Sequence, residues 1–377
     1  MLRVLFILPN VCGGGAERVV LSVLRHLDRT HFQPILFLTK NEGILWDEIP
    51  ADTKVFYGMQ QGLKLKWHLF EVLRRLLYAA RDADIIVGSL EYDSIYLASL
   101  AGWLLRRPVV GWTHVEMFNY PKRILIDHVL PRLLYPGVNL MLTVSQGVSQ
   151  SLERQYPWLK SRIRTAYNPL DLVLIDNKRN ETLDEYFQQD IPVVLGVGRL
   201  VTQKNFSLLI RAHAMLLARG IRQELVIIGE GPERASLEEL ACKLGVQDSV
   251  RLPGFLLNPY PNMCKASCLV LSSQYEGWGS VVLEAMALGV PTIVVNCLGS
   301  GSEVVGDGEY GLLIPPNDLE AMVDAIMALL TDPKLARHYM LKGRERAEQF
   351  GIAHRIPVYE RLLLEARQSS ASGENAG

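Results

Sequence analysis

The sequence predicts an α/β fold of two tandem domains, each built around a parallel sheet. Short apolar runs alternate with longer helical patterns, and this alternation occurs twice along the 377 residues. Strands that alternate with helices pair in parallel and carry helices on both faces of the sheet. A polar stretch without a clear period separates the two alternating runs.

Five segments follow from this pattern. The first domain is predicted to span 1–170, the polar stretch 171–190 is predicted to be a linker, and the second domain is predicted to span 191–351. A C-terminal helix over 352–367 is expected to pack back toward the first domain. The tail 368–377 is small and polar and is predicted to be disordered.

The individual elements follow from local patterns. The strands predicted for the first domain are Val4–Leu8, Pro34–Thr39, Asp84–Ser89, Val109–Trp112 and Leu140–Val144. The strands predicted for the second domain are Val193–Val197, Glu224–Ile228, Cys268–Ser272 and Pro291–Val295. The predicted helices include Ala16–Leu27 and Val281–Leu288. Asn205 is expected to cap a helix, and Asn317 with Glu320 forms a capping signal for another.

Composition and charge argue against a nucleic-acid-binding, a disulfide-rich and a membrane-spanning protein. Hydrophobic residues make up 49% and the net charge is −1, which fits a well-cored globular chain without the basic excess of a nucleic-acid binder. Residues 1–175 carry 20 Lys and Arg against 15 Asp and Glu. This positive half could face an anionic acceptor or an anionic membrane, or the excess could be ordinary variation in charge along a chain. The five cysteines form no disulfide framework and favour a reducing, cytoplasmic location. The apolar runs are too short for a membrane span.

The second domain carries two loops suited to a phosphorylated ligand. Arg199 and Lys204 lie in a predicted strand-to-helix loop, where together they could neutralise a diphosphate; taken alone, they could also be solvated surface cations. Gly277 and Gly279 of the next such loop allow a ligand close to the backbone and to the free amides of a helix start. Glu276 and Glu284 flank these glycines and could hold sugar or ribose hydroxyls, although a carboxylate near a helix start also stabilises the helix dipole.

With these two loops, the sequence resembles GT-B glycosyltransferases, in particular glycosyltransferase family 4. The resemblance extends over nearly the whole chain and rests on the order and spacing of several segments. These segments are Gly13–Glu17, Trp112–His114, Asn168–Asp171, Arg199 with Lys204, Gly229–Pro232, Glu276 with Glu284, and Gly311–Asp318. It implies two Rossmann-like domains whose sheets face an interdomain cleft.

The resemblance also implies roles for single residues. Arg199 and Lys204 would bind the donor diphosphate and stabilise it as leaving group, Glu276 would contact the transferred sugar, and His114 would lie near that sugar. The other implied donor contacts are Gly231, Phe255, Gly279, Ser280, Val281, Val282 and Glu284. Gly14 and Gly15 would let the first domain's loop close over the donor and shape the acceptor site. The family retains anomeric configuration without a protein nucleophile.

No metal or cofactor is expected. The glycine loop matches neither a P-loop nor a dinucleotide fingerprint. Asp82 and Asp84 are interpreted as a solvated turn rather than a metal site, and Cys264 and Cys268 as buried thiols.

The segments 63–81 and 122–135 suggest peripheral contact with an anionic membrane. On a helical wheel, the first segment has one broad apolar face that includes Leu69 and Phe70, with Trp67 and Tyr78 on the other side. An ordinary core helix is the alternative interpretation.

The sequence therefore predicts a retaining, metal-independent hexosyl- or N-acetylhexosaminyltransferase of bacterial surface-glycan assembly. A UDP-sugar is the favoured donor, GDP-mannose is next, and a lipid-linked glycan is the expected acceptor. A nucleotide-sugar 2-epimerase of the same fold and a non-catalytic relative that binds nucleotide sugars are the alternatives.

Overall fold

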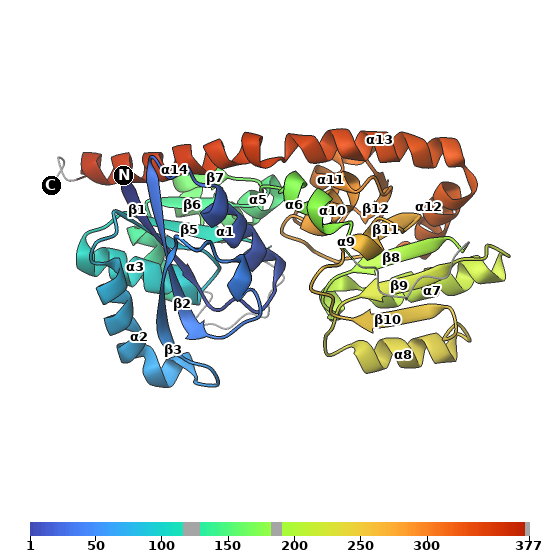
Figure 1. Ribbon diagram of the computed structural model, residues 1–377, viewed down its shortest axis with the longest axis horizontal. Helices are drawn as coiled ribbons and strands as arrows, with labels where there is room; N and C mark the ends of the chain where they lie inside the picture. Colours follow the sequence, from blue (N-terminus) through green and yellow to red (C-terminus); the bar gives the residue numbers. More distant parts are fainter. Residues whose placement is uncertain (116–128, 182–190, 374–377) are drawn as a thin grey trace. The chain divides into compact units, whose positions relative to one another are not determined.

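The computed structural model describes residues 1–115, 129–181 and 191–373, and it divides into two compact units (Figure 1). Unit 1 consists of Met1–Pro169 together with the C-terminal helix that begins at Ile352. Unit 2 consists of Leu170–Gly351. Each unit has its own parallel sheet, which is the predicted fold class.

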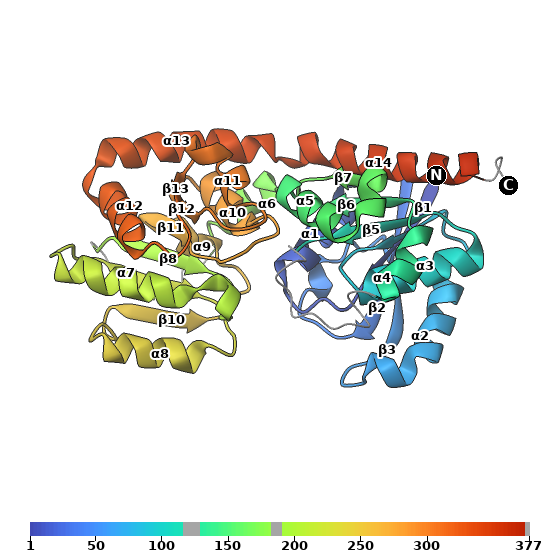
Figure 2. The same ribbon diagram turned by 180° about the vertical axis from the view of Figure 1, so that it is seen from behind.

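Unit 1 contains a seven-stranded parallel sheet in the order β3-β2-β1-β4-β5-β6-β7. Its strands are β1 (Leu2–Leu8), β2 (Phe32–Asn41), β3 (Lys54–Gln60), β4 (Ile85–Gly88), β5 (Val109–Thr113), β6 (Leu140–Thr143) and β7 (Ile163–Thr165). Its helices are α1 (Gly15–His26), α2 (Leu65–Ala80), α3 (Asp93–Leu105), α4 (Leu130–Leu134), α5 (Gln146–Gln155) and α14 (Ile352–Gly373). Alternate residues of a strand point to opposite faces, and Leu5 and Ile7 of β1 share a core with Val72 of α2 and Ile95 of α3. Helices α1 and α14 contact each other, and α14 also contacts β4 and β5 (Figure 2).

Unit 2 contains a six-stranded parallel sheet in the order β10-β9-β8-β11-β12-β13. Its strands are β8 (Val193–Val197), β9 (Glu224–Ile228), β10 (Val250–Gly254), β11 (Cys268–Leu271), β12 (Thr292–Val295) and β13 (Leu312–Ile314). Its helices are α6 (Leu172–Lys178), α7 (Phe206–Ala218), α8 (Arg234–Lys243), α9 (Tyr260–Met263), α10 (Ser280–Ala287), α11 (Gly301–Val304), α12 (Leu319–Thr331) and α13 (Pro333–Gln349). A short 3-10 turn, Thr202–Lys204, precedes α7.

Both sheets reverse their strand order at an equivalent place. In unit 1 the chain adds β2 and β3 on one side of β1 and then returns to place β4 on the other side, while in unit 2 the reversal lies between β8 and β11. In open α/β sheets, ligands bind beyond the carboxyl ends of the strands at such a switch point. The topology therefore directs attention to the loops that follow β1 and β4, and to those that follow β8 and β11.

The predicted linker is partly wrong, because its first half belongs to unit 2. Asp171 caps α6 by accepting a hydrogen bond from the Leu174 amide at 2.9 Å, and Ile175 of this helix is buried. The run Leu172–Ile175 is therefore the beginning of a capped helix rather than irregular chain. The second half of the predicted linker, 182–190, lies outside the described residues.

Two further predictions need correction at helix ends. Helix α14 continues to Gly373, so 368–373 is helical rather than disordered; Ser369 Oγ donates to the Glu365 carbonyl at 2.9 Å, which keeps this polar side chain compatible with the helix. The cap of α12 is Asp318, which accepts from the Ala321 amide at 2.9 Å. Asn317 instead has a left-handed backbone with φ of 57°.

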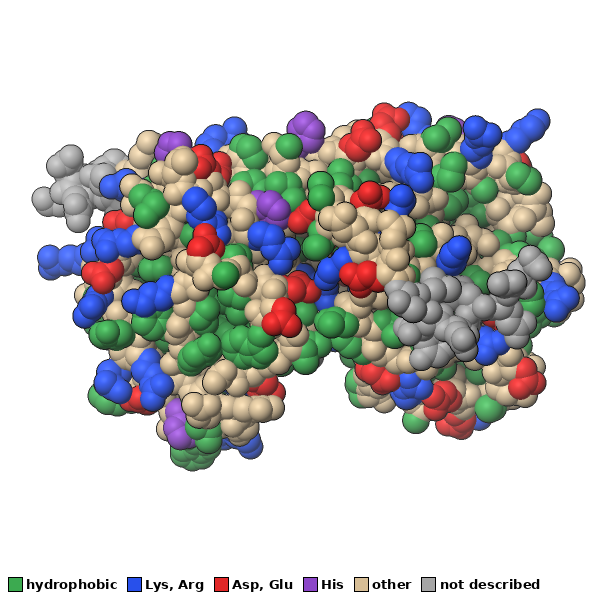
Figure 3. Space-filling view, in the orientation of Figure 1, with side chains coloured by type: hydrophobic (Ala, Val, Ile, Leu, Met, Phe, Trp, Pro, Cys, Tyr) green, Lys and Arg blue, Asp and Glu red, His purple; other side chains and the backbone are tan. Residues whose placement is uncertain are grey.

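The predicted apolar face of α2 is also wrong in part. The buried residues are Val72, Leu76, Ala79 and Ala80, which form a narrow stripe at helical spacing. Phe70, which was placed on the buried face, is 83% exposed. The remaining exposed side includes aromatic rings, and green side chains lie beside blue ones over this end of unit 1 in Figure 3. Within the described ranges, every helix is too short or too polar to cross a membrane.

Candidate active site

The loops that follow β8 and β11 are bound to each other at the switch point of unit 2. The Gln274 amide donates to the Gln203 carbonyl at 2.8 Å, and the Gln203 side chain donates to the Tyr275 carbonyl at 2.8 Å. Ser272 Oγ donates to the Lys204 carbonyl at 2.7 Å. Because three hydrogen bonds join these loops, side chains on one loop are held in fixed positions relative to those on the other.

Lys204 and Glu276 form an ion pair between these two loops. Lys204 Nζ contacts Glu276 Oε1, and the same oxygen accepts a hydrogen bond from Ser273 Oγ at 2.6 Å. The side chains are 18% and 9% exposed, so water screens the pair only weakly. Removing one partner of such a pair leaves the other charge buried and uncompensated. The sequence predicted separate roles for these residues, and the structure adds that they contact each other directly.

Arg199 provides a second cation at the same sheet edge. Its side chain is exposed, and within the described part of the chain it forms no ion pair or hydrogen bond. A free guanidinium presents several donors to an incoming anion without first having to break an existing contact. Glycine is needed nearby at Gly231, because a Cβ there would overlap the carbonyl oxygen of Leu200.

Helix α10 starts four residues after Glu276. Its N-cap is Gly279, which has a left-handed backbone with φ of 70° and provides no side-chain cap. The predicted contacts Ser280, Val281 and Val282 form the first turn of this helix, where backbone N–H groups and the helix dipole favour an anion. Glu284, one turn further along the helix, is partly buried.

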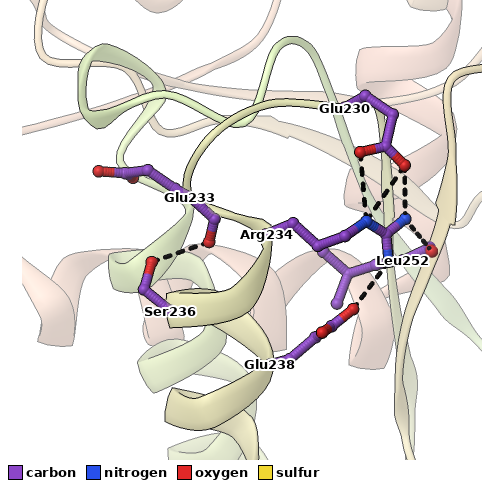
Figure 4. A network of polar contacts seen from close by, with 6 residues as sticks. All are labelled: Glu230, Glu233, Arg234, Ser236, Glu238 and Leu252. Carbon is purple, nitrogen blue, oxygen red and sulfur yellow. Dashed lines mark hydrogen bonds and ion pairs between the residues drawn. The ribbon is translucent and has the colours of Figure 1, made fainter.

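Arg234, which was not among the residues predicted from the sequence, links the loop after β9 to the outer strand of the sheet. Arg234 donates to Glu230 at 2.8 Å, to Glu238 at 2.7 Å and to the carbonyl of Leu252 at 2.8 Å (Figure 4). It therefore ties the loop after β9 to strand β10. The spacing of four residues between each glutamate and Arg234 was the available sequence signal.

This network surrounds two of the predicted donor contacts. Gly231 lies in the loop that Arg234 fixes, and Phe255, directly after β10, is 46% exposed. The hydrogen bond with Arg234 holds the pKa of Glu230 below its usual range, so this carboxylate remains ionised and paired at neutral pH.

The glycine loop of unit 1 follows β1 and is closed by Glu17. Glu17 Oε2 accepts hydrogen bonds from the amides of Gly13 at 2.8 Å and Gly14 at 2.6 Å. Of these two glycines, Gly13 has the left-handed backbone, with φ of 103°. The space beside Gly15 is open, since a Cβ there would meet no atom within 4 Å. Of Gly14 and Gly15, the two glycines predicted to close over a donor, Gly14 therefore has its amide occupied by a carboxylate.

His114 lies directly after β5. The centre of its ring is 4.6 Å from that of Trp112, and the Trp112 ring centre is 5.0 Å from that of Tyr359 in α14. Burial lowers the pKa of His114 to about 3, so the ring is neutral at physiological pH. Neither ring nitrogen has a hydrogen-bond partner of good geometry among the described residues. A neutral imidazole can donate one hydrogen bond and accept another.

The remaining sequence candidates have structural roles. The Asp84 carboxylate accepts from the Arg3 amide at 2.8 Å, and Arg3 also forms ion pairs with Asp82 at 3.9 Å and Asp84 at 3.7 Å. Asp82 and Asp84 directly precede β4, so they lie at the amino-terminal ends of the strands, opposite the loops where a ligand is expected to bind. Cys268 is buried, which raises the pKa of its thiol to about 12.

Comparison with known proteins identifies the family. A family model described as glycosyl transferases group 1 matches residues 178–346, and one described as glycosyltransferase family 4 matches residues 13–174. The lipopolysaccharide core biosynthesis glycosyltransferase LpsD of Rhizobium meliloti is 33% identical over 345 residues, which cover 88% of this chain and 89% of that protein. The chain belongs to glycosyltransferase family 4.

Other known proteins are similar over a smaller part of the chain or at lower identity. N-acetylgalactosamine-N,N'-diacetylbacillosaminyl-diphospho-undecaprenol 4-alpha-N-acetylgalactosaminyltransferase of Campylobacter jejuni is 32% identical over 226 residues, and the match covers 60% of each protein. The crystal structure of Anabaena HepE with UDP and glucose has a TM-score of 0.82 at 19% identity, covering 96% of this chain and 99% of HepE. At this identity the structural likeness establishes the GT-B fold.

The structure of this glycosyltransferase groups the predicted site residues by unit. Unit 2 brings Lys204 and Glu276 into contact and places the start of α10 beside them. Unit 1 carries His114 and the glycine loop at the carboxyl ends of β5 and β1.

Proposed function

We propose that this glycosyltransferase transfers a hexose or N-acetylhexosamine from a UDP-sugar to a lipid-linked glycan, with retention and without a metal ion. The observation that carries the proposal is the pairing of Lys204 with Glu276 at the switch point of unit 2, next to the exposed Arg199. Two cations can neutralise a diphosphate leaving group in the way that a metal ion does elsewhere.

In the proposed reaction, the acceptor hydroxyl attacks the anomeric carbon on the face from which the diphosphate leaves. The new bond forms between the acceptor oxygen and that carbon, while the bond from the carbon to the phosphate oxygen breaks. The hydroxyl proton passes to an oxygen of the departing diphosphate. Arg199, Lys204 and the amides at the start of α10 stabilise the charge that develops there.

The carboxylate and the imidazole have orienting roles in this proposal. Glu276 accepts a hydrogen bond from a hydroxyl of the transferred sugar, and its contacts with Lys204 and Ser273 hold it in place. His114 hydrogen-bonds the sugar as a neutral ring, because its burial disfavours the imidazolium form. Glu284 binds the ribose hydroxyls.

The names of similar proteins support the choice of donor and acceptor. UDP and glucose occupy the HepE structure, which has the same fold. The Campylobacter jejuni relative is named for a diphospho-undecaprenol acceptor. We therefore place UDP-sugars before GDP-mannose as donors, and polyprenyl-diphosphate glycans first among acceptors.

We also propose that unit 1 contacts an anionic membrane, where such acceptors reside. Trp67 and Phe70 of α2 are 75% and 83% exposed, and Trp103 of α3 is 75% exposed. Lys64 and Lys66 lie at the start of α2, where Lys66 Nζ is 5.1 Å from the centre of the Trp67 ring. Exposed aromatic rings among cations are suited to the interface of an anionic bilayer. In the predicted second contact, 122–135, residues 122–128 lie outside the described residues. Flotation with anionic but not zwitterionic liposomes tests this surface, and a Trp67→Ser/Phe70→Ser variant should lose it.

A melting-temperature screen with UDP, GDP, ADP and CMP in the presence of EDTA tests the donor assignment. A ligand that binds only the folded protein raises its melting temperature by mass action. We expect a rise with UDP that EDTA does not reduce, followed by transfer of labelled sugar from the matching UDP-sugar to a polyprenyl-diphosphate glycan. A rise that requires a divalent cation would contradict metal independence. Turnover of the donor to an epimer without any acceptor would replace the transferase proposal by an isomerase.

A further inference from the structure

Two glutamates occupy equivalent positions in the two units. Strand β4 of unit 1 and strand β11 of unit 2 both lie beside the first strand of their sheet, on the side where the order reverses. Glu91 lies in the loop after β4 and Glu276 in the loop after β11. The sequence analysis selected Glu276 and missed Glu91, which belongs to none of the motifs that carry the resemblance.

Glu91 joins two neighbouring loops at the ligand edge of unit 1. One carboxylate oxygen, Oε1, accepts hydrogen bonds from the backbone amides of His114 and Val115, the second at 2.9 Å. Because β4 and β5 pair directly, this side chain bridges the loops that follow two adjacent strands. Its two contacts fix the backbone at the residue that carries the neutral imidazole.

The arrangement is unfavourable for stability, which argues against a purely structural role. Among the described residues, no cation pairs with Glu91, and burial raises the pKa of its carboxyl group. The next residue, Tyr92, has φ of 58° and ψ of −109°, a conformation that a residue with a Cβ rarely adopts. Strained backbone of this kind is found preferentially at functional sites. A glutamine could accept the same two hydrogen bonds without placing a charge in this environment.

We propose that Glu91 is a positioning residue that holds the loop after β5 so that the His114 ring faces the sugar. A charged acceptor makes stronger hydrogen bonds to backbone amides than a neutral one. The ring itself packs against Trp112, and the Glu91 contacts fix the backbone at His114 and Val115. This proposal rests on the role proposed for His114 above.

Two substitutions of Glu91 test the assignment. Glu91→Ala removes both contacts and should lower kcat by about 10- to 100-fold, because small misplacements of a group at a reacting centre have effects of this size. Glu91→Gln keeps neutral versions of the contacts and should recover most of that loss. Donor KM should change little in both variants, because the proposed diphosphate contacts are in unit 2.

Glu224 provides the matched control, since it is a buried glutamate at the opposite edge of its sheet. It forms an ion pair with Arg251 at 3.0 Å. Glu224→Gln should lower the melting temperature and leave kcat unchanged. Glu91→Gln should show the reverse at pH 7, with an equal or higher melting temperature and a lower kcat. A wild-type kcat in Glu91→Ala would overturn the proposal.

Amide hydrogen exchange provides a readout that does not depend on activity. The peptide that contains His114 and Val115 should exchange faster in Glu91→Ala than in the wild type, with Glu91→Gln intermediate. If the wild type transfers no sugar from any donor, the proposed function fails, and the exchange data still decide whether Glu91 holds this loop. Unchanged exchange in Glu91→Ala would contradict the proposal even if activity fell. Should Glu91→Ala not fold, Glu91→Gln carries the same comparison.

Discussion

The two switch points carry a glutamate at the same position of the sheet, but the groups that surround its carboxylate differ. In unit 2, Glu276 contacts Lys204 and accepts a further hydrogen bond from Ser273. In unit 1, the contacts of Glu91 with other described residues are hydrogen bonds from backbone amides, and the neighbouring His114 is neutral. Unit 2 thus pairs a carboxylate with a cation, which suits the proposed diphosphate site, whereas unit 1 sets a carboxylate held by amides beside a neutral imidazole. The same topology therefore supports two kinds of recognition, and the side chains in the loops decide which one.

Breaking the charge pair of unit 2 should have the largest effect. Lys204→Ala removes a cation from the leaving group and leaves Glu276 buried without its partner, so we expect kcat to fall by about 10²- to 10³-fold. The free energy of unfolding should fall by about 3 kcal/mol for the same reason. Steady-state kinetics and urea denaturation measure the two effects.

A second substitution separates catalysis from stability. In Lys204→Ala/Glu276→Gln the uncompensated charge is gone, so stability should recover while activity remains low. Lys243→Ala, on the exposed part of α8, is the control for loss of a lysine and should change neither quantity. Full activity in Lys204→Ala would contradict the proposal that Lys204 stabilises the charge of the leaving diphosphate.

Arg199→Ala should produce a smaller and cleaner effect. Arg199 is exposed and makes no ion pair within the described ranges, so its removal leaves no buried charge behind. We expect kcat/KM to fall by about 10- to 100-fold, with an unchanged melting temperature. Arg211→Ala, which removes another exposed arginine from unit 2, should leave kcat/KM at the wild-type value. Equal losses in both variants would mean that the effect is one of overall charge.

The lowered pKa of His114 in unit 1 should affect how the free energy of unfolding depends on pH. His114 has a pKa of about 3 when folded, against 6.5 for an ordinary histidine. A depressed pKa gives stability that is present above pH 6.5 and is lost as the pH falls toward 3, at a slope approaching about 1.4 kcal/mol per pH unit. Between pH 7.5 and 5.5 the wild type should therefore lose about 1 kcal/mol more than His114→Phe.

Denaturation curves of both proteins at these two pH values measure that difference. His213 also has a lowered pKa through burial, but it is present in both proteins and cancels in the comparison. The pH profile of kcat should show no inflection from His114 between pH 5 and 8. An identical pH dependence in wild type and His114→Phe would mean that the ring is protonated in the folded protein or exposed to solvent.

The sequence predicted those parts of the molecule that depend on local pattern. Alternating apolar runs located most strands, and the donor loops could be placed because each follows a strand and opens a helix. Strand β3 (Lys54–Gln60) was missed because only Gly58 and Met59 of it are buried and the glycine interrupts its short apolar run. The contact of Glu91 with His114 joins residues 23 positions apart, and neither residue carries a local signal for it. The position of Phe70 was misjudged because α2 buries only a narrow stripe, whose width depends on the neighbouring helix and strands.

The smallest expected effect concerns the glycine loop, and it distinguishes two roles for unit 1. Glu17 occupies the amides of Gly13 and Gly14, so a donor phosphate that approached them would meet a carboxylate. Glu17→Gln keeps the capping contacts but removes the charge, which should lower the free energy of unfolding by less than about 1 kcal/mol. If the loop closes over the donor, donor KM should fall by about two- to three-fold, because like-charge repulsion is relieved. If donor KM is unchanged and acceptor KM shifts instead, the loop recognises the acceptor alone, and the contrast between a charged donor unit and a neutral acceptor unit becomes sharper.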